Sequence, residues 1–135
     1  MAEPVGAKPV GIVLVSHSES LAAGLRDLLL QVSGPDVTVA DAGGTADGRL
    51  GTSDERIRAA IGRADTGGGV VVLTDLGSAV LTTLAVLAEP AREDVVLVDA
   101  PFVEGAVAAA VTASTGADLA TVVAAAEEAR SVPKF

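Results

Sequence analysis

The stretch VGIVLVSHSESLAAGL, residues 10–25, contains the features that decide the fold. Residues 10–15 are an unbroken apolar run of strand length, and leucines at helical spacing follow soon after it. His17, the single histidine of the chain, lies where the two segments meet and has a serine on each side. The pattern predicts a buried strand, a turn and a helix whose N-cap is Ser18 or Ser20.

The same alternation of apolar runs and helical segments continues along the rest of the chain. Three more runs, at residues 37–40, 70–74 and 95–98, predict strands. A capping box formed by Thr52 and Glu55 predicts the start of the second helix. Helical segments are expected at residues 21–32, 57–64, 80–87, 100–113 and 118–130, with Asp118 as the N-cap of the last.

This succession of strands and helices predicts βαβ units, which need right-handed crossovers and a parallel sheet covered on both faces. The strands are apolar throughout rather than alternating, as expected for strands buried on both faces. We therefore expect an α/β doubly wound fold with a mainly parallel four-stranded sheet in the order 2-1-3-4 and helices on both faces. Residues 1–135 should form one domain, with residues 1–9 as a flexible tail.

Composition excludes several classes of function. Asp and Glu outnumber Lys and Arg by 18 to 9, and the resulting net charge of -9 argues against binding to nucleic acid or an anionic membrane. The chain has no cysteine and one histidine, so disulfides, zinc–thiolate sites and multi-histidine metal sites are excluded, and we expect no metal. Neither a signal peptide nor a membrane-spanning segment is apparent, so a cytoplasmic location is expected.

In sheets of the predicted order, ligands bind outside the carboxyl ends of the strands, at the point where the strand order reverses. His17 follows the first strand and Asp75 follows the third, so we expect the two side chains to face each other there. The carboxylate would accept Nδ1–H of the imidazole and leave Nε2 as a nucleophile. Asp75 would thus orient His17, as the acid of a catalytic triad orients its histidine.

An anion site is expected beside His17, because the N-termini of two predicted helices point toward this edge of the sheet. Ser16, Ser78 and the loop at residues 43–45 are candidates to supply hydroxyl and N–H groups to a phosphoryl group. Together these residues outline a phosphohistidine site. The residues alone leave a plainer interpretation open, in which His17 is an exposed loop histidine and the serines only cap helices.

Further motifs extend over nearly the whole chain. They are GGT at 43–45, LGTSDERI at 50–57, VVVLTDLGSAV at 70–80 and DAPFVEGAVAAAV at 99–111. In this order and spacing, together with the stretch around His17, they resemble the phosphotransfer subunits of dihydroxyacetone kinase. Those subunits form a branch of the mannose-type enzyme IIA family of the phosphoenolpyruvate-dependent sugar phosphotransferase system.

The resemblance implies a phosphotransferase component that works through a phosphohistidine. His17 would accept a phosphoryl group from the phosphocarrier protein HPr and donate it to ADP held on the partner subunit DhaL, which acts with DhaK. Asp75 would be the partner of the histidine. The groups implied on the phosphate side are Ser16, Gly44, Thr45, Gly77 and Ser78, with Thr52 and Ser53 as further candidates. The resemblance also implies a homodimer without a cofactor of its own, ADP and Mg²⁺ belonging to the partner.

Two other functions remain open from the sequence. The first is a IIA component of a mannose-type sugar transporter, which would donate to a IIB domain, and the second is a non-catalytic α/β module that binds an anion or a protein. The segment APFVEGA at residues 100–106 favours the kinase subunit over the sugar transporter. It is also compatible with a plain helix start, with Pro101 at an early helical position and Val103 and Val107 packing inward, and it leaves Glu104 without a role.

Overall fold

The computed structural model describes residues 8–135, so most of the tail predicted at residues 1–9 lies outside the described part. The strands are β1 (Gly11–Ser16), β2 (Val39–Gly43), β3 (Val70–Thr74) and β4 (Val95–Leu97). The helices are α1 (Glu19–Ser33), α2 (Asp54–Ala64), α3 (Gly77–Ala88), α4 (Phe102–Ser114) and α5 (Leu119–Glu128), followed by the 3-10 helix η1 (Ala129–Ser131).

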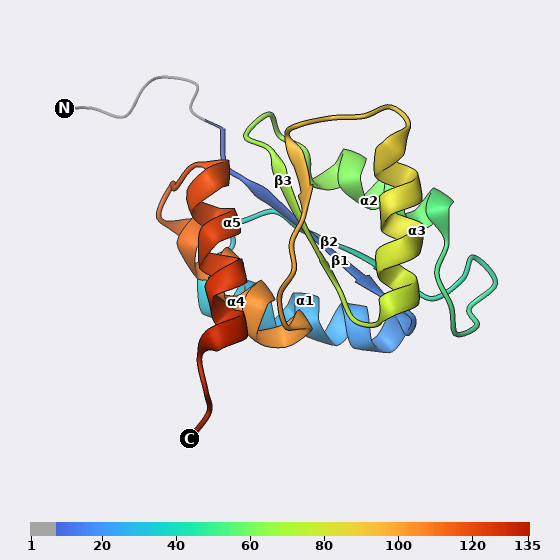
Figure 1. Cartoon of the computed structure of the whole chain (residues 1–135), viewed down its shortest axis with the longest axis horizontal. Coiled ribbons are helices and arrows are strands. Elements are labelled where there is room, and N and C mark those ends of the chain that lie inside the picture. Colours follow the sequence, from blue (N-terminus) through green and yellow to red (C-terminus); the bar gives the residue numbers. More distant parts are fainter. Residues whose placement is uncertain (1–7) are drawn as a thin grey trace.

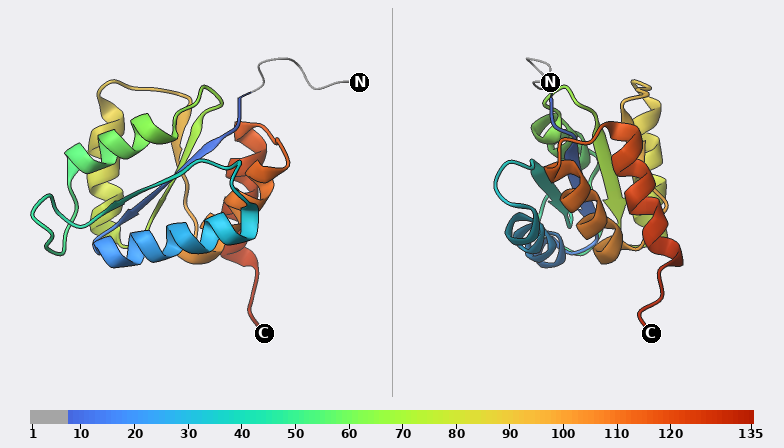
Figure 2. Two further views of the ribbon diagram at one scale, coloured as in Figure 1. Left: turned by 180° about the vertical axis from the view of Figure 1, so that it is seen from behind. Right: turned by 90° about the vertical axis from the view of Figure 1, so that its left-hand side faces the viewer.

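The four strands form one parallel sheet in the order β2-β1-β3-β4, which confirms the predicted fold. Ile12 of β1 is paired with Val39 of β2 on one side and with Val71 of β3 on the other. All carboxyl ends therefore meet at one edge of the sheet, and the strand order reverses between β1 and β3. The sheet lies between two layers of helices, α1, α4 and α5 on one face and α2 and α3 on the other (Figures 1 and 2).

Alternate residues of β1 contribute to the cores on the two faces of the sheet. Ile12 and Leu14 pack on the side of α1, α4 and α5, whereas Val13 and Val15 pack on the side of α2 and α3. All four side chains are fully buried. Burial of each such aliphatic side chain stabilises the fold by about 1.5–3 kcal/mol, so the strand that carries His17 at its end is firmly held.

The second strand was predicted at residues 37–40 but is formed by Val39–Gly43. The β-branched Val37 and Thr38 lie just before it, with Val37 buried in the core and the carbonyl of Thr38 accepting a hydrogen bond from the N–H of Ile12 at 2.9 Å. The strand then continues from Asp41 to Gly43, where Asp and Gly, which are uncommon in strands, gave no indication of a strand in the sequence. A Cβ at Gly43 would lie 2.5 Å from the carbonyl oxygen of Ser18, so a glycine is needed there for β2 to pass the start of α1.

Three helix starts can be compared with the predictions. Ser18 caps α1 and Asp118 caps α5, as predicted, each accepting a hydrogen bond from the backbone three residues on. The capping box at Thr52 was wrong, because Ser53 is the N-cap of α2 and accepts from the N–H of Arg56. The hydroxyl of Thr52 instead lies 2.9 Å from that of Thr82 in α3, and this contact ties the start of α2 to the neighbouring helix.

The segment at residues 100–106 begins α4 in part as expected. Pro101 is the N-cap residue, just before the helix rather than inside it. Val107 packs against the core, whereas Val103 is 42% exposed, so its predicted inward packing was wrong. Val103 borders an open apolar groove between α4, α5 and the C-terminal segment.

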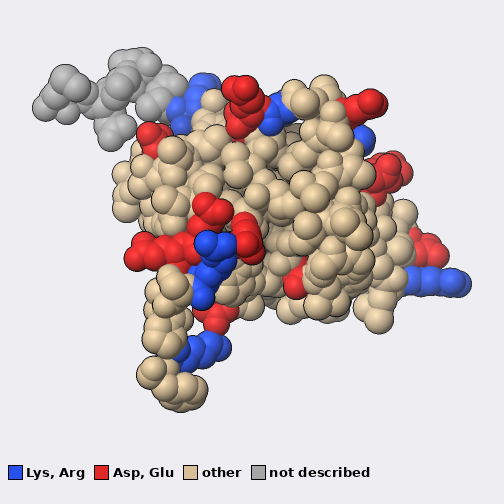
Figure 3. Space-filling view, in the orientation of Figure 1, with Lys and Arg blue, Asp and Glu red and all other residues tan. Residues whose placement is uncertain are grey.

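Two surface properties bear on function. In residues 8–135, no helix has both the length and the apolar character needed to cross a membrane. On the face drawn in Figure 3, acidic and basic side chains are interspersed rather than gathered into a continuous basic patch. That the protein does not bind nucleic acid stays a prediction from its net charge of -9.

Candidate functional site

His17 and Asp75 meet at the carboxyl edge of the sheet. His17 follows β1 and Asp75 follows the neighbouring β3, and the imidazole Nδ1–H donates to the Asp75 carboxylate Oδ1 at 2.9 Å. The side chains are 21% and 10% exposed, so the pair lies at the surface with its carboxylate largely covered. The predicted contact between the two residues is confirmed.

The Asp75 carboxylate is the centre of the local hydrogen-bond network. Besides the imidazole, it accepts the Ser16 hydroxyl at 2.9 Å, the backbone N–H of His17 at 3.0 Å and that of Leu76 at 2.7 Å. Burial alone would raise the pKa of Asp75, but the hydrogen bonds from His17, Ser16 and Leu76 outweigh it, and the pKa falls below its ordinary value. The carboxylate is therefore ionised at neutral pH and holds the imidazole as its Nδ1–H tautomer.

With Nδ1 engaged, the other ring nitrogen of His17 points to the start of α3. Nε2 faces the hydroxyl of Ser78, the second residue of that helix. The residue before α3 is Leu76, which cannot cap the helix, and within residues 8–135 the N–H groups of Gly77 and Ser78 have no hydrogen-bond acceptor. Unpaired N–H groups at a helix N-terminus attract anions. Nε2 of His17 thus lies beside a helix N-terminus of the kind that attracts anions.

Gly77 has a backbone that any residue could adopt. A Cβ built on it would meet no atom within 4 Å, so the fold does not require a glycine at this position. Gly77 and Ser78 begin α3, and the hydroxyl of Ser78 faces Nε2 of His17. Their contact with a phosphoryl group stays a prediction.

Ser16 differs from its predicted role. It was expected to contact the phosphoryl group, but it is fully buried, and its hydroxyl donates to Asp75 and accepts the N–H of Ser18 at 3.0 Å. Ser16 is the last residue of β1, and its hydroxyl stabilises the Asp75 carboxylate by a hydrogen bond. The structure thus shows Ser16 as a hydrogen-bond partner of Asp75, and its predicted contact with a phosphoryl group stays untested.

The loop after β2, residues 44–51, also differs from expectation. Gly44 and Thr45 were predicted to donate to a phosphoryl group, but the N–H of Gly44 donates to the Ser16 carbonyl at 3.0 Å and that of Thr45 to the Arg49 carbonyl at 2.9 Å. The Thr45 hydroxyl donates to Asp47. The hydrogen bonds of Thr45 stabilise the shape of the loop, and that of Gly44 attaches the loop to the residue before His17.

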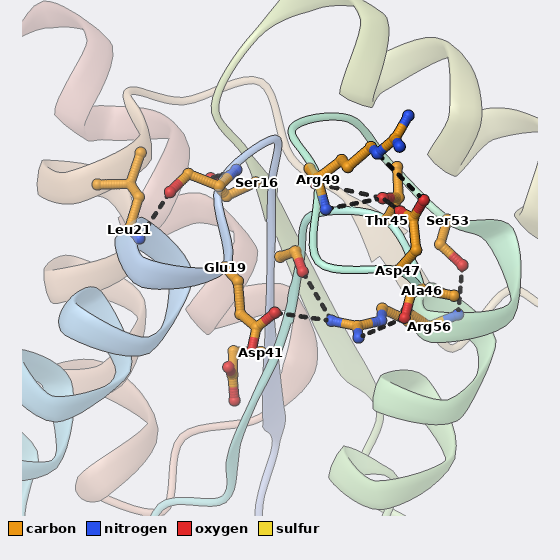
Figure 4. A network of polar contacts seen from close by, with 12 residues as sticks. Ser16, Glu19, Leu21, Asp41, Thr45, Ala46, Asp47, Arg49, Ser53 and Arg56 are labelled. Atoms are coloured by element: carbon orange, nitrogen blue, oxygen red, sulfur yellow. Dashed lines mark hydrogen bonds and ion pairs between the residues drawn. The ribbon is translucent and has the colours of Figure 1, made fainter.

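Arg56 is a part of the site that sequence reasoning missed. This α2 residue donates to the Gly43 carbonyl at 3.0 Å and the Ala46 carbonyl at 3.4 Å, and its guanidinium lies 3.4 Å from the carboxylate of Glu19 (Figure 4). No sequence pattern indicates that an arginine will reach backbone carbonyls of a distant loop. The uncapped start of α3 could have been predicted from the sequence, because a helix that begins at Gly77 has Leu76 as its N-cap residue, and leucine has no side-chain acceptor.

The chemistry available at this site is that of an imidazole nucleophile and an anion. Across residues 8–135, no group of three or more His, Asp or Glu side chains is placed to hold a metal ion. Transfer of a phosphoryl group between nitrogen and another acceptor depends on positioning and on stabilisation of anionic oxygens, which Nε2 and the start of α3 can provide.

Comparisons with known proteins show the family to which the chain belongs. The family described as "PTS system fructose IIA component", of the mannose-type enzyme IIA, matches residues 11–123. The phosphoryl donor subunit DhaM of PEP-dependent dihydroxyacetone kinase 1 from Listeria innocua is 39% identical over 104 residues, which cover 77% of this chain and 82% of that subunit. The chain belongs to the DhaM branch of the mannose-type enzyme IIA family.

Other members of the DhaM branch differ in length. The corresponding subunit of kinase 2 from Listeria innocua is 39% identical over 105 residues, which cover 76% of this chain and 84% of that subunit. The DhaM subunit of Escherichia coli is 38% identical over 120 residues, 84% of this chain, but the match spans 25% of that much longer protein.

Solved structures match nearly the whole chain. The crystal structure of EF1359, a protein described as of unknown function, is 36% identical with a TM-score of 0.81, covering 94% of this chain and 98% of that one. The phosphotransferase system component EIIA from Streptococcus agalactiae has a TM-score of 0.68 at 18% identity, covering 93% of this chain and 97% of that one, and this likeness shows the shared fold.

Proposed function

We propose that the protein is a phosphoryl carrier of a phosphoenolpyruvate-dependent dihydroxyacetone kinase. It accepts a phosphoryl group from phospho-HPr on Nε2 of His17 and donates it to ADP bound on DhaL, the subunit that acts with DhaK. One observation carries the proposal: Asp75 engages Nδ1, so Nε2 is presented to the uncapped start of α3. Membership of the DhaM branch, whose relatives are named phosphoryl donor subunits of PEP-dependent dihydroxyacetone kinases, supports this choice of donor and acceptor.

The first step makes a nitrogen–phosphorus bond on His17. Nε2 carries no proton in the Nδ1–H tautomer, so its lone pair attacks the phosphorus while the bond from phosphorus to the HPr imidazole breaks. The leaving electron pair returns to the HPr nitrogen. Asp75 balances the positive charge that develops on the ring of His17, and the N–H groups of Gly77 and Ser78 receive the phosphoryl oxygens.

The second step reverses the roles. A terminal phosphate oxygen of ADP attacks the phosphorus, the bond to Nε2 breaks, and ATP forms on DhaL while the neutral imidazole returns to its hydrogen bond with Asp75. The proposal places ADP and Mg²⁺ on the partner and no cofactor on this chain. The cytoplasmic location and the homodimer implied by the resemblance belong to the same proposal.

The rim of the site is suited to protein partners. Leu76 is 60% exposed at the start of α3, Leu81 is 70% exposed one turn later, and Leu50 is 80% exposed in the loop beside His17. Exposed leucines gathered around a polar centre are typical of surfaces that bind proteins. HPr and DhaL would contact this rim in turn, each for the time of one transfer.

The test is intact-mass spectrometry of the purified chain after incubation with phosphoenolpyruvate, enzyme I and HPr. We expect one added phosphate that is lost in brief acid, and none in His17→Ala. Because His17 is the single histidine, an acid-labile phosphate that persists in the variant would contradict the proposal. The same would follow if the wild-type chain stayed unmodified beside phosphorylated HPr.

The acceptor is tested with the phosphorylated chain. Loss of the phosphate on addition of DhaL carrying ADP, with formation of ATP, is expected. Transfer instead to a IIB domain of a mannose-type sugar transporter would place the protein in sugar transport, while retention of the phosphate with both acceptors would overturn the donor role.

A further inference from the structure

The two ends of the loop at residues 44–51 form hydrogen bonds with the main chain around His17. At one end, the N–H of Gly44 donates to the carbonyl of Ser16 at 3.0 Å. At the other end, the N–H of Gly51 donates to the carbonyl of His17 itself at 2.9 Å. The loop therefore fixes the peptides on both sides of the His17 Cα, and with them the direction in which the imidazole leaves the chain.

This loop has little apolar packing to hold it in place. Residues 46–50 are exposed, and Leu50 is 80% exposed. Its internal hydrogen bonds, such as that from the N–H of Gly48 to the carbonyl of Thr45 at 3.0 Å, keep its shape but do not attach it to the body of the protein. The attachment must come from contacts with neighbouring elements.

Arg56 provides such an attachment. Its guanidinium joins four elements, because it projects from α2, donates to Gly43 at the end of β2 and Ala46 in the loop, and lies beside Glu19 at the start of α1 (Figure 4). The planar guanidinium suits this task, since it can donate to several acceptors in fixed directions at once. The side chain is 35% exposed, so most of it is covered by the groups it joins.

We propose that Arg56 is a positioning residue for phosphoryl transfer. By tethering Gly43 and Ala46, it keeps the loop closed on the carbonyls of Ser16 and His17, and so keeps the imidazole aligned with Asp75 and with the start of α3. It touches neither the ring nor the phosphoryl group. This role deepens the proposed function and rests on it.

The structure offers a matched control. Arg63 lies on the same helix and donates to the carbonyl of Asp41 at 3.2 Å, on the same strand but away from the loop. Arg56→Met and Arg63→Met each remove one guanidinium and keep an apolar stem. Arg56→Lys keeps the charge beside Glu19, but a single ammonium cannot bridge Gly43 and Ala46 as the guanidinium does.

Two measurements are made on the purified full-length proteins. The first is the rate of phosphorylation by phospho-HPr at saturating donor, where misplacement of the ring in Arg56→Met should lower the rate about 10-fold. The second is ¹⁵N NMR of the imidazole, which reports on one residue because the chain has one histidine. Here Arg56→Met should show a mixture of ring tautomers or broadened ring signals, where the wild type shows the Nδ1–H form.

We expect Arg63→Met to match the wild type in both measurements and Arg56→Lys to recover the rate in part. An unchanged rate and ring spectrum in Arg56→Met would overturn the proposal, and so would an equal loss in Arg63→Met or full recovery with lysine. If the wild type is not phosphorylated at all, the proposed function fails, and the ring spectra alone decide whether Arg56 positions His17. Circular dichroism of each variant establishes that it is folded.

Discussion

Two helices begin beside His17, and their N-termini are completed in different ways. α1 is capped by Ser18, whose hydroxyl accepts the N–H of Leu21 at 3.2 Å. α3 begins after Leu76, which gives it no side-chain cap. A helix without a favourable N-cap residue is less stable by about 1 kcal/mol, so the start of α3 is less stable than the start of α1 by about this amount.

The location of the uncapped end indicates why it is retained. Ser53 and Asp118 cap α2 and α5, and α4 also begins without a side-chain cap, after Pro101. In the part of the chain that the structure describes, α3 is the helix whose uncapped end faces the free nitrogen of an imidazole. The two helix starts therefore differ in their side-chain cap and in what they face, and the proposed function assigns the start of α3, which faces Nε2, to the phosphoryl group.

The largest effect is expected from Asp75, which connects the two helix starts by accepting from His17 on one side and Leu76 on the other. Asp75→Asn removes the charge and replaces one of the two acceptor oxygens with an NH2 donor, so the side chain can no longer accept all four hydrogen bonds that fix the Nδ1–H tautomer. The rate of phosphorylation by phospho-HPr should fall about 100-fold. Asp118→Asn, at the cap of α5, is the matched control and should keep the wild-type rate. Wild-type turnover in Asp75→Asn would remove the carboxylate from the mechanism.

A smaller effect is expected when α3 is given a cap. Leu76→Ser and Leu76→Asp should each raise the free energy of unfolding by about 0.5–1 kcal/mol, measured by urea denaturation. The aspartate places a negative charge beside the incoming phosphoryl group, so transfer should slow about 10-fold relative to Leu76→Ala, with the serine variant between the two. If the aspartate variant transfers as fast as Leu76→Ala, the start of α3 does not receive the phosphoryl group.

The reverse change at α1 should affect stability and leave transfer almost intact. Ser18→Ala removes the cap from α1 and should lower the free energy of unfolding by about 1 kcal/mol, because the N–H of Leu21 loses its acceptor. Its phosphorylation rate should stay within about twofold of the wild type, since the N–H of Ser18 still donates to Ser16. A much slower rate with unchanged stability would reverse the roles assigned to the two helix ends.

The pH dependence of stability gives the smallest expected signal. The pKa of Asp75 lies below its ordinary value of 3.8, so its ionised form stabilises the folded state above that pH. This contribution is lost as the pH falls from about 3.8 through the lower pKa of the folded state. The difference in unfolding free energy between wild type and Asp75→Asn should therefore shrink in this range, as followed by urea titrations between neutral pH and pH 2. A difference that stays constant would show that the hydrogen bonds do not favour the ionised carboxylate.

Much of this architecture could be predicted from the sequence, because apolar runs without alternation indicate buried parallel strands and the strand order then fixes the site. His17 and Asp75 were brought together by that argument alone. The pattern of strands does not predict the contacts of individual side chains, so the hydrogen bond from the Ser16 hydroxyl to Asp75 was not predicted. It also does not predict hydrogen bonds to carbonyls of distant segments, so the contacts of Arg56 and the hydrogen bond from the N–H of Gly44 to the Ser16 carbonyl were missed.

The central claim is that Nε2 of His17 carries the phosphoryl group while Nδ1 keeps its proton on Asp75. It is tested most directly by ¹H–¹⁵N NMR of the ¹⁵N-histidine-labelled protein after phosphorylation by phospho-HPr, with phosphorus coupling used to identify the bonded nitrogen. The account predicts phosphorus on Nε2 and a protonated Nδ1. Phosphorus on Nδ1, which would require the ring to leave Asp75, would contradict it.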